Sequence, residues 1–69
     1  MLRENAGYII IKAEREESNK NFEVVLGTNN KFYVTWECKA GYDYFWGHYF
    51  TDYKEALKDY YTRLLNTIE

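Results

Sequence analysis

The sequence contains no proline, and cysteine and histidine occur once each, as Cys38 and His48. A single cysteine cannot form a disulfide within the chain, which favours a reducing compartment such as the cytoplasm. Structural zinc sites use four ligands, mostly cysteine and histidine, so we expect no metal and no other cofactor. We interpret Cys38 as a buried thiol and His48 as a structural residue in an aromatic cluster.

Long apolar runs and an excess of basic residues are also missing. The longest apolar run, Tyr8–Ile11, has four residues, whereas a membrane-spanning helix needs about 20. No basic stretch followed by an apolar run occurs near the N-terminus, so we expect no signal peptide. Nine Lys and Arg against 11 Asp and Glu give a net charge of −2. This balance disfavours a protein that coats nucleic acid non-specifically.

The motifs of common enzyme classes are missing as well. The chain has neither a glycine-rich loop for phosphate nor a Ser-His-Asp set, so we expect a protein without catalytic residues. Glu14, Glu16 and Glu17 form an acidic run whose carboxylates could bind a divalent metal. We interpret this run as a solvated loop, with a small metal-dependent DNA nickase kept as an alternative function.

Aromatic residues are what the chain has in excess. They make up 20% of all residues, and nine of the 20 residues from Lys31 to Phe50 are Phe, Tyr or Trp. Aromatic side chains bury a large area each, and they are also enriched where proteins bind their partners. We therefore expect this segment to supply both core residues and a binding surface.

The pattern along the chain predicts four strands and one helix. Strand-forming residues fill 7–14, 22–27, 31–39 and 42–50, while the polar residues 1–6 are expected to fray. Thr51 or Asp52 can cap a helix, and Glu55 stands three residues after Asp52. An apolar stripe follows at helical spacing, formed by Tyr53, Ala56, Leu57, Tyr60, Leu64 and Ile68, with Lys54, Lys58, Asp59, Thr62 and Arg63 on the opposite side.

These elements predict a single domain, residues 1–69, of the α+β class: a four-stranded antiparallel meander followed by one C-terminal helix packed on one face. A two-residue turn at 29–30 places Val25 opposite Val34, and a two-residue turn at 40–41 places Trp36 opposite Phe45. The first face of the sheet then carries Val25, Phe32, Val34, Trp36, Cys38, Phe45 and Tyr49. The second carries Phe22, Val24, Leu26, Tyr33, Thr35, Tyr44, Trp46 and His48.

A single helix leaves one of these faces uncovered. A helix of about 17 residues is roughly 25 Å long and covers one face only. We expect it on the first face, where Gly47 permits a close approach. The second face would remain exposed, and an apolar surface of that size usually marks an interface.

Three interpretations of the exposed face stay open. The first is a homodimer with Phe22, Val24 and Leu26 at its interface. The second is a nucleic-acid surface on which bases stack against aromatic rings beside cations, and the third is a surface for a protein partner. The residues expected to contact nucleic acid or a partner are Tyr33, Tyr44, Trp46, His48, Lys12, Lys31 and Lys39, with Lys20 as a further cation.

The order of four strands and one helix in a chain this short resembles the positive-coactivator-like family, whose members are homodimeric single-stranded-DNA-binding proteins. The segments YVTW (33–36) and GHYFTDYKEAL (47–57) are similar to the passage from strand to helix in that family. Where family members carry Lys and Arg along the DNA-facing strands, this sheet carries Tyr, Trp and Glu. The chain also resembles small proteins of clostridial phages and mobile elements, among them anti-CRISPR proteins of similar architecture. The resemblance implies a DNA-associated homodimer, in its most specific form an anti-CRISPR factor. The alternative is a protein-interaction module without a nucleic-acid role.

Overall fold

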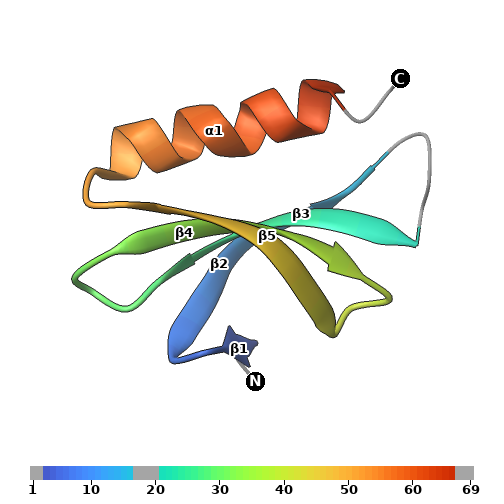
Figure 1. Cartoon of the computed structure of the whole chain (residues 1–69), viewed down its shortest axis with the longest axis horizontal. Helices are drawn as coiled ribbons and strands as arrows, with labels where there is room; N and C mark the ends of the chain where they lie inside the picture. The colour runs from blue at the N-terminus through green and yellow to red at the C-terminus, as the bar shows by residue number, and fades with distance from the viewer. Residues whose placement is uncertain (1–2, 17–20, 67–69) are drawn as a thin grey trace.

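The computed structural model describes residues 3–16 and 21–66, which form a five-stranded antiparallel sheet and one helix (Figure 1). The strands are neighbours in chain order, and the helix lies across one face of the sheet. The α+β class, the antiparallel meander and the C-terminal helix are confirmed. No helix in the described residues is long and apolar enough to cross a membrane. The elements are β1 (Glu4–Asn5), β2 (Tyr8–Arg15), β3 (Phe22–Thr28), β4 (Tyr33–Lys39), β5 (Asp43–Phe50) and α1 (Tyr53–Asn66).

The prediction of four strands is wrong, because the segment before Tyr8 contributes β1. Ala6 and Gly7 form the turn between β1 and β2, with positive φ values of 53° and 84°. Two-residue hairpin turns that match the twist of a sheet use this left-handed conformation. A strand of two polar residues shows no alternation of apolar and polar positions, so the sequence pattern could not indicate it.

The loop between β3 and β4 is longer than predicted. Asn29 Oδ1 accepts hydrogen bonds from the backbone N–H groups two and three residues later, at 3.0 and 2.7 Å. These bonds close a four-residue loop, 29–32, so that Val25 lies opposite Trp36 rather than Val34. The register moves by an even number of residues, and every side chain of β3 and β4 therefore keeps its predicted face.

The turn between β4 and β5 has three residues, 40–42, instead of the predicted two. Phe45 therefore lies opposite Glu37, and Tyr44 lies opposite Cys38. Because a shift of one residue exchanges the two faces, both aromatic side chains lie on the faces opposite to those predicted.

A bulge at Trp46 restores the predicted faces farther along β5. The register shifts between Thr35 and Glu37, and Trp46 has a φ of 55° in the left-handed region. A bulge adds one residue to a strand and bends it. Beyond it, His48 lies opposite Thr35 and Tyr49 lies on the predicted first face.

The helix covers the face that carries Val24 and Leu26, which we call the helix face, and not the face predicted. The connection explains this choice, because Phe50 at the end of β5 lies on the helix face and only residues 51–52 separate it from α1. The predicted apolar stripe of α1 does contact the sheet, although Ile68 lies outside the described residues. The contact consists of the buried Val24, Leu26, Ala56 and Tyr60, with Tyr33, Phe50, Leu57 and Leu64 packed around them.

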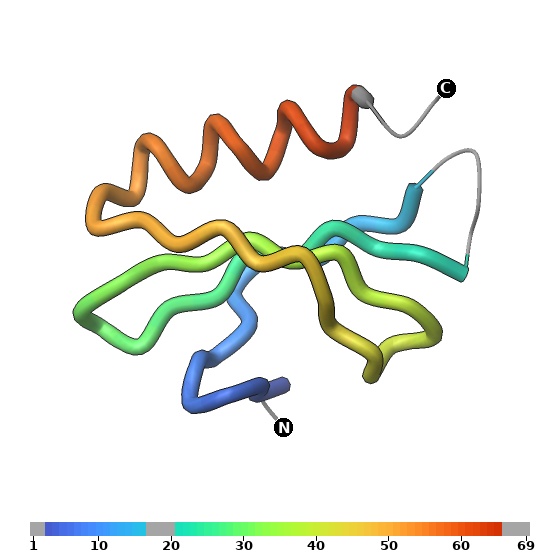
Figure 2. Tube along the Cα trace, viewed as in Figure 1, coloured from blue at the N-terminus to red at the C-terminus, as the bar shows by residue number. Residues whose placement is uncertain are grey.

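The opposite side of the sheet, called the Trp36 face, closes without a helix because aromatic rings from distant strands meet over it. The ring centroid of Tyr8 on β2 lies 5.7 Å from that of Trp36 and 6.0 Å from that of Tyr49 on β5. Two strands separate β2 from β5 in the sheet, and Figure 2 shows the lower halves of both bending away from the helix. Trp36 is consequently only 5% exposed. Neither face is left uncovered, so the prediction of an exposed second face is wrong.

Gly47 lets the indole of Trp36 lie directly against β5. A Cβ atom at position 47 would stand 2.7 Å from the indole Nε1 and 3.0 Å from Cδ1. We predicted that this glycine admits the helix, but the group that it admits is the buried tryptophan of the other face.

Candidate functional site

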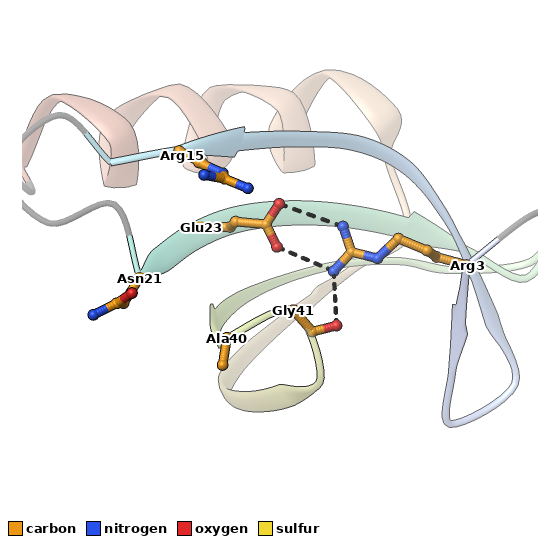
Figure 3. Close-up of a pocket in the computed structure, with 6 residues that line it drawn as sticks. All are labelled: Arg3, Arg15, Asn21, Glu23, Ala40 and Gly41. Carbon is orange, nitrogen blue, oxygen red and sulfur yellow. Dashed lines mark hydrogen bonds and ion pairs between the residues drawn. The ribbon is translucent and has the colours of Figure 1, made fainter.

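A pocket of about 400 Å³ opens at one end of the Trp36 face, beside the turn between β4 and β5. Arg3 precedes β1, Arg15 ends β2 and Glu23 lies near the start of β3, so segments far apart in the sequence converge here. Figure 3 shows the Glu23 carboxylate between the two arginine side chains. The pocket is lined by Arg3, Arg15, Asn21, Glu23, Ala40 and Gly41.

The guanidinium of Arg3 forms one side of this pocket and is held in place by hydrogen bonds. Its Nη1 and Nη2 donate to the two carboxylate oxygens of Glu23 at 3.4 and 3.1 Å. Nη2 also donates to the Tyr44 hydroxyl at 3.0 Å and to the Gly41 carbonyl at 3.4 Å. Burial lowers the pKa of Arg3, but the bonds to Glu23 and Tyr44 outweigh it and leave the pKa above its ordinary value. Arg3 therefore stays charged and holds the N-terminal segment against β3 and β5.

The Cys38 thiol lies beneath this ion pair. It is fully buried, with its Sγ 3.7 Å from Nη2 of Arg3. Burial and the charge of Glu23 raise the pKa of Cys38 above its ordinary value. The thiol is therefore protonated near neutral pH and lacks the thiolate character of reactive cysteines, in agreement with the predicted buried thiol.

Arg15 forms the other side of the pocket and carries a charge that no carboxylate neutralises within the described residues. Its side chain is exposed, and it makes no hydrogen bond or ion pair with residues 3–16 or 21–66. Both oxygens of Glu23 are bonded to Arg3. The described residues of its lining include two guanidinium groups and one carboxylate, which together carry a net charge of +1.

A second distinctive region is β5, which forms one edge of the sheet and carries strongly exposed aromatic side chains. Trp46 is 74% exposed and Tyr49 is 60% exposed, while Tyr42 in the preceding turn is 77% exposed. The ring centroid of Trp46 lies 5.0 Å from that of Phe45. Exposed aromatics at an unpaired sheet edge are a feature of interaction surfaces.

Polar side chains of the helix reach down to the sheet at the middle of α1. Asp59 Oδ2 accepts a hydrogen bond from the Thr35 hydroxyl at 2.5 Å and lies 3.0 Å from Nδ1 of His48. Burial raises the pKa of Asp59, but hydrogen bonds from Thr35, His48 and Arg63 lower it more strongly, to below its ordinary value. His48 is thus bound to a carboxylate on the helix and not enclosed in the predicted aromatic cluster.

Arg63 joins the last turns of α1 to β4 and β5. Its Nε donates to Asp59 at 3.2 Å, and its Nη1 donates to Glu37 at 3.2 Å. Nη2 donates to the backbone carbonyl of Trp46 at the bulge. We predicted Asp59 and Arg63 on the solvent side of the helix, and this is wrong because their charged ends bind polar groups of the sheet. Their spacing of four residues indicates the ion pair between them, but not their contacts with the sheet.

Glu16, in the middle of the acidic run, faces Glu37 on the helix face. It is only 8% exposed. Burial and a hydrogen bond with Glu37 raise the pKa of Glu16 to about 7. Glu14 accepts a hydrogen bond from the Tyr60 hydroxyl at 2.9 Å, and Glu17 lies outside the described residues. No group of three or more His, Cys, Asp or Glu within the described ranges is arranged to hold a metal ion.

The aromatic residues and the histidine predicted to share one binding surface are not brought together. Tyr33 and His48 lie on the helix face, where the ring centroid of Tyr33 is 5.4 Å from that of Tyr53. Tyr44 packs against Trp36 on the opposite face, and Trp46 is exposed at the edge of the sheet. Of this set, only Trp46 keeps a large aromatic surface in contact with solvent.

The predicted cations are also dispersed. The Lys12 amino group lies 5.9 Å from the ring centroids of two tyrosines on α1. Lys31 belongs to the loop that precedes β4 and Lys39 ends that strand, so they stand at opposite ends of it. Lys20 lies outside the described residues. The cations that do gather are Arg3, in the segment expected to fray, and Arg15, which falls between the first two predicted strands, and no spacing in the sequence marks them as partners.

Two of the three predicted dimer-interface residues, Val24 and Leu26, are fully buried beneath α1. The third, Phe22, is partly buried, with its ring centroid 6.4 Å from that of Phe45. Comparison of the chain with protein-family models, with curated proteins and with solved structures found no match. The family resemblance therefore stays a prediction, and the arginine pocket and the β5 edge carry the functional argument.

Proposed function

We propose that this chain is a small, non-enzymatic interaction protein of the phage or mobile-element type, which acts as a homodimer assembled along β5. The observation that carries this proposal is the exposure of Trp46 and Tyr49 on a strand whose outer edge has no neighbouring strand within the described residues. Tryptophan and tyrosine contribute a large share of the binding energy in protein interfaces. Exposed rings at an unpaired edge therefore favour a second polypeptide as the partner.

The geometry of β5 favours contact through side chains over an unbroken strand ladder. The bulge at Trp46 interrupts the edge, and bulges restrict pairing between the edges of two sheets. In a twofold dimer the same patch meets itself, so an axis passing near Trp46 would bring this residue of both copies together. The buried Val24 and Leu26 cannot form this interface, and the proposal moves it to β5.

The test is the assembly state over a range of micromolar concentrations, measured by sedimentation velocity. We expect a concentration-dependent dimer whose dissociation constant rises at least tenfold in Trp46→Ala. Leu65→Ala is the matched control, because Leu65 is 72% exposed but lies on α1. A strict monomer at high concentration, or equal weakening by the two variants, would overturn the proposal.

DNA association is a second candidate function, favoured by the charge at the pocket end of the sheet. Arg3 and Arg15 lie beside the turn that follows Lys39, although the whole chain has a net charge of −2. A local cluster of cations is the electrostatic signature of phosphate binding. Titration with single-stranded and supercoiled DNA should show an affinity that falls as salt rises, and absence of binding at low salt would remove this candidate. An anti-CRISPR role is its most specific form and rests on the sequence resemblance.

A further inference from the structure

We propose that the pocket between Arg3 and Arg15 binds a phosphoryl group, presented either by a small phosphate ester or by a nucleic acid. This inference goes beyond the homodimer along β5 and does not depend on it. It assigns a ligand chemistry to the pocket, and its test separates the two sources of the phosphoryl group.

Hydrogen bonds within the chain hold one wall of the pocket in place. Arg3 is fixed by both oxygens of Glu23 and by the Tyr44 hydroxyl, and its Nη2 also donates to the Gly41 carbonyl in the pocket wall. The Ala40 N–H donates to the carbonyl of Asn21 at 2.8 Å, which ties the turn to the start of β3. A ligand therefore meets a wall that is already ordered, and less conformational entropy is lost on binding.

The positive charge of the pocket lining favours the binding of an anion. Glu23 neutralises one of the two guanidinium groups, and the charge of Arg15 has no carboxylate partner among the described residues. A guanidinium has five N–H donors arranged for two-pronged binding of oxyanions. An anionic oxygen group bound at Arg15 would balance the +1 charge that remains on the described residues of the lining.

The placement of the arginines favours a phosphoryl group over a carboxylate. Figure 3 shows Arg15 and Arg3 approaching Glu23 from different sides. A planar carboxylate uses both of its oxygens on one guanidinium, as Glu23 does on Arg3, whereas a phosphoryl group bound at Arg15 has a further oxygen for a second donor of the pocket. The volume of about 400 Å³ lies in the range of small-molecule sites, about 300–1,000 Å³, so the organic part of an ester also fits.

The experiment follows backbone amide NMR shifts of the full chain during titration with adenosine monophosphate, inorganic phosphate, acetate and a short oligothymidylate at constant ionic strength. We expect both phosphates to shift the amides of Asn21, Glu23 and Gly41, and acetate to leave them unchanged. Arg15→Gln should weaken adenosine monophosphate binding at least tenfold. Lys54→Gln, which removes an exposed cation of α1, should leave it unchanged.

The probes also identify the source of the phosphoryl group. Saturation by adenosine monophosphate at concentrations similar to those of the oligonucleotide supports a small ester, and a much tighter oligonucleotide complex that also requires Arg15 supports a nucleic acid. The proposal is overturned if acetate shifts the same amides as phosphate, if no pocket amide responds, or if both substitutions weaken binding equally. The amide spectrum of each variant shows directly that it is folded.

Discussion

Replacement of the two tryptophans tests how the Trp36 face is closed. Trp36 is 5% exposed and is surrounded by the rings of Tyr8, Tyr44 and Tyr49, with centroid distances of 5.7, 5.5 and 6.4 Å. We expect Trp36→Ala to lower the free energy of unfolding by about 3–5 kcal/mol, because the substitution removes buried apolar surface and leaves a cavity. Trp46 is 74% exposed, so Trp46→Ala should change the free energy of unfolding of the monomer by at most about 0.5 kcal/mol.

The large loss of stability expected for Trp36→Ala decides how this loss must be measured. A domain of 69 residues has a total stability of about 3–10 kcal/mol at the usual value per residue, so Trp36→Ala can unfold much of the population in buffer. Trp36→Phe keeps one aromatic ring in the cluster and should cost about 1–2 kcal/mol. This variant stays folded and can be compared directly with the parent chain.

Urea unfolding followed by circular dichroism is the appropriate assay. The dependence of the free energy on urea concentration should be the same for all variants, so that differences in midpoint report stability alone. Low protein concentration keeps dimer formation from adding to the apparent stability. If Trp36→Ala and Trp46→Ala lowered the free energy of unfolding equally, or if Trp36→Ala lowered it by less than about 1 kcal/mol, the conclusion that Trp36 is enclosed in the core would be refuted.

Two further predictions concern Gly47 and Glu16. Gly47→Ala should lower the free energy of unfolding by about 1–3 kcal/mol, because its Cβ would stand 2.7 Å from the Trp36 indole; an unchanged urea midpoint would contradict this contact. The folded state raises the pKa of Glu16 from 4.5 to about 7, so it binds this proton more tightly than the unfolded chain does. The stability that Glu16 contributes should therefore be full below about pH 4.5 and lost as the pH rises through about 7. Glu16→Gln should remove this part of the pH dependence in thermal unfolding, and an identical slope in the variant would show that another group is responsible.

The elements that could be predicted from the sequence are those with strong local signals. The helix follows from its capping residues and from the stripe that includes Ala56 and Tyr60, both of which are fully buried. The four long strands follow from β-branched and aromatic segments. β1 was missed because two polar residues carry no periodicity, and its position depends on the left-handed turn at Ala6 and Gly7.

The faces were harder to predict, because they depend on single residues in turns. Because the turn 40–42 has one residue more than predicted, Tyr44 and Phe45 each lie on the face opposite to the predicted one. The bulge at Trp46 adds a second residue, so that His48 lies on its predicted face. The choice of face by the helix depended on where Phe50 points at the end of β5. None of these features changes the apolar pattern of the sequence, so periodicity alone could not resolve them.

The arginine pocket shows the same limit for function. Arg3 and Arg15 stand in polar segments, and the pairing of β1 with β2 and of β2 with β3 brings them to Glu23. The exposed Trp46 was identified correctly as a surface residue, but its supposed partners Tyr33 and Tyr44 lie elsewhere. Sites formed by long-range contacts between ordinary charged residues leave no local motif to recognise.

The bonds made by Arg3 also have a consequence for the order in which the chain folds. They connect residues separated by 20 positions, to Glu23, and by 41 positions, to Tyr44. Contacts between residues so distant in sequence require large loops to close first, and a high share of such contacts slows folding. Because these bonds join Arg3 to Glu23 of β3 and to Tyr44 of β5, the full set can form only once both strands lie together in the sheet, and we expect it to form late in folding.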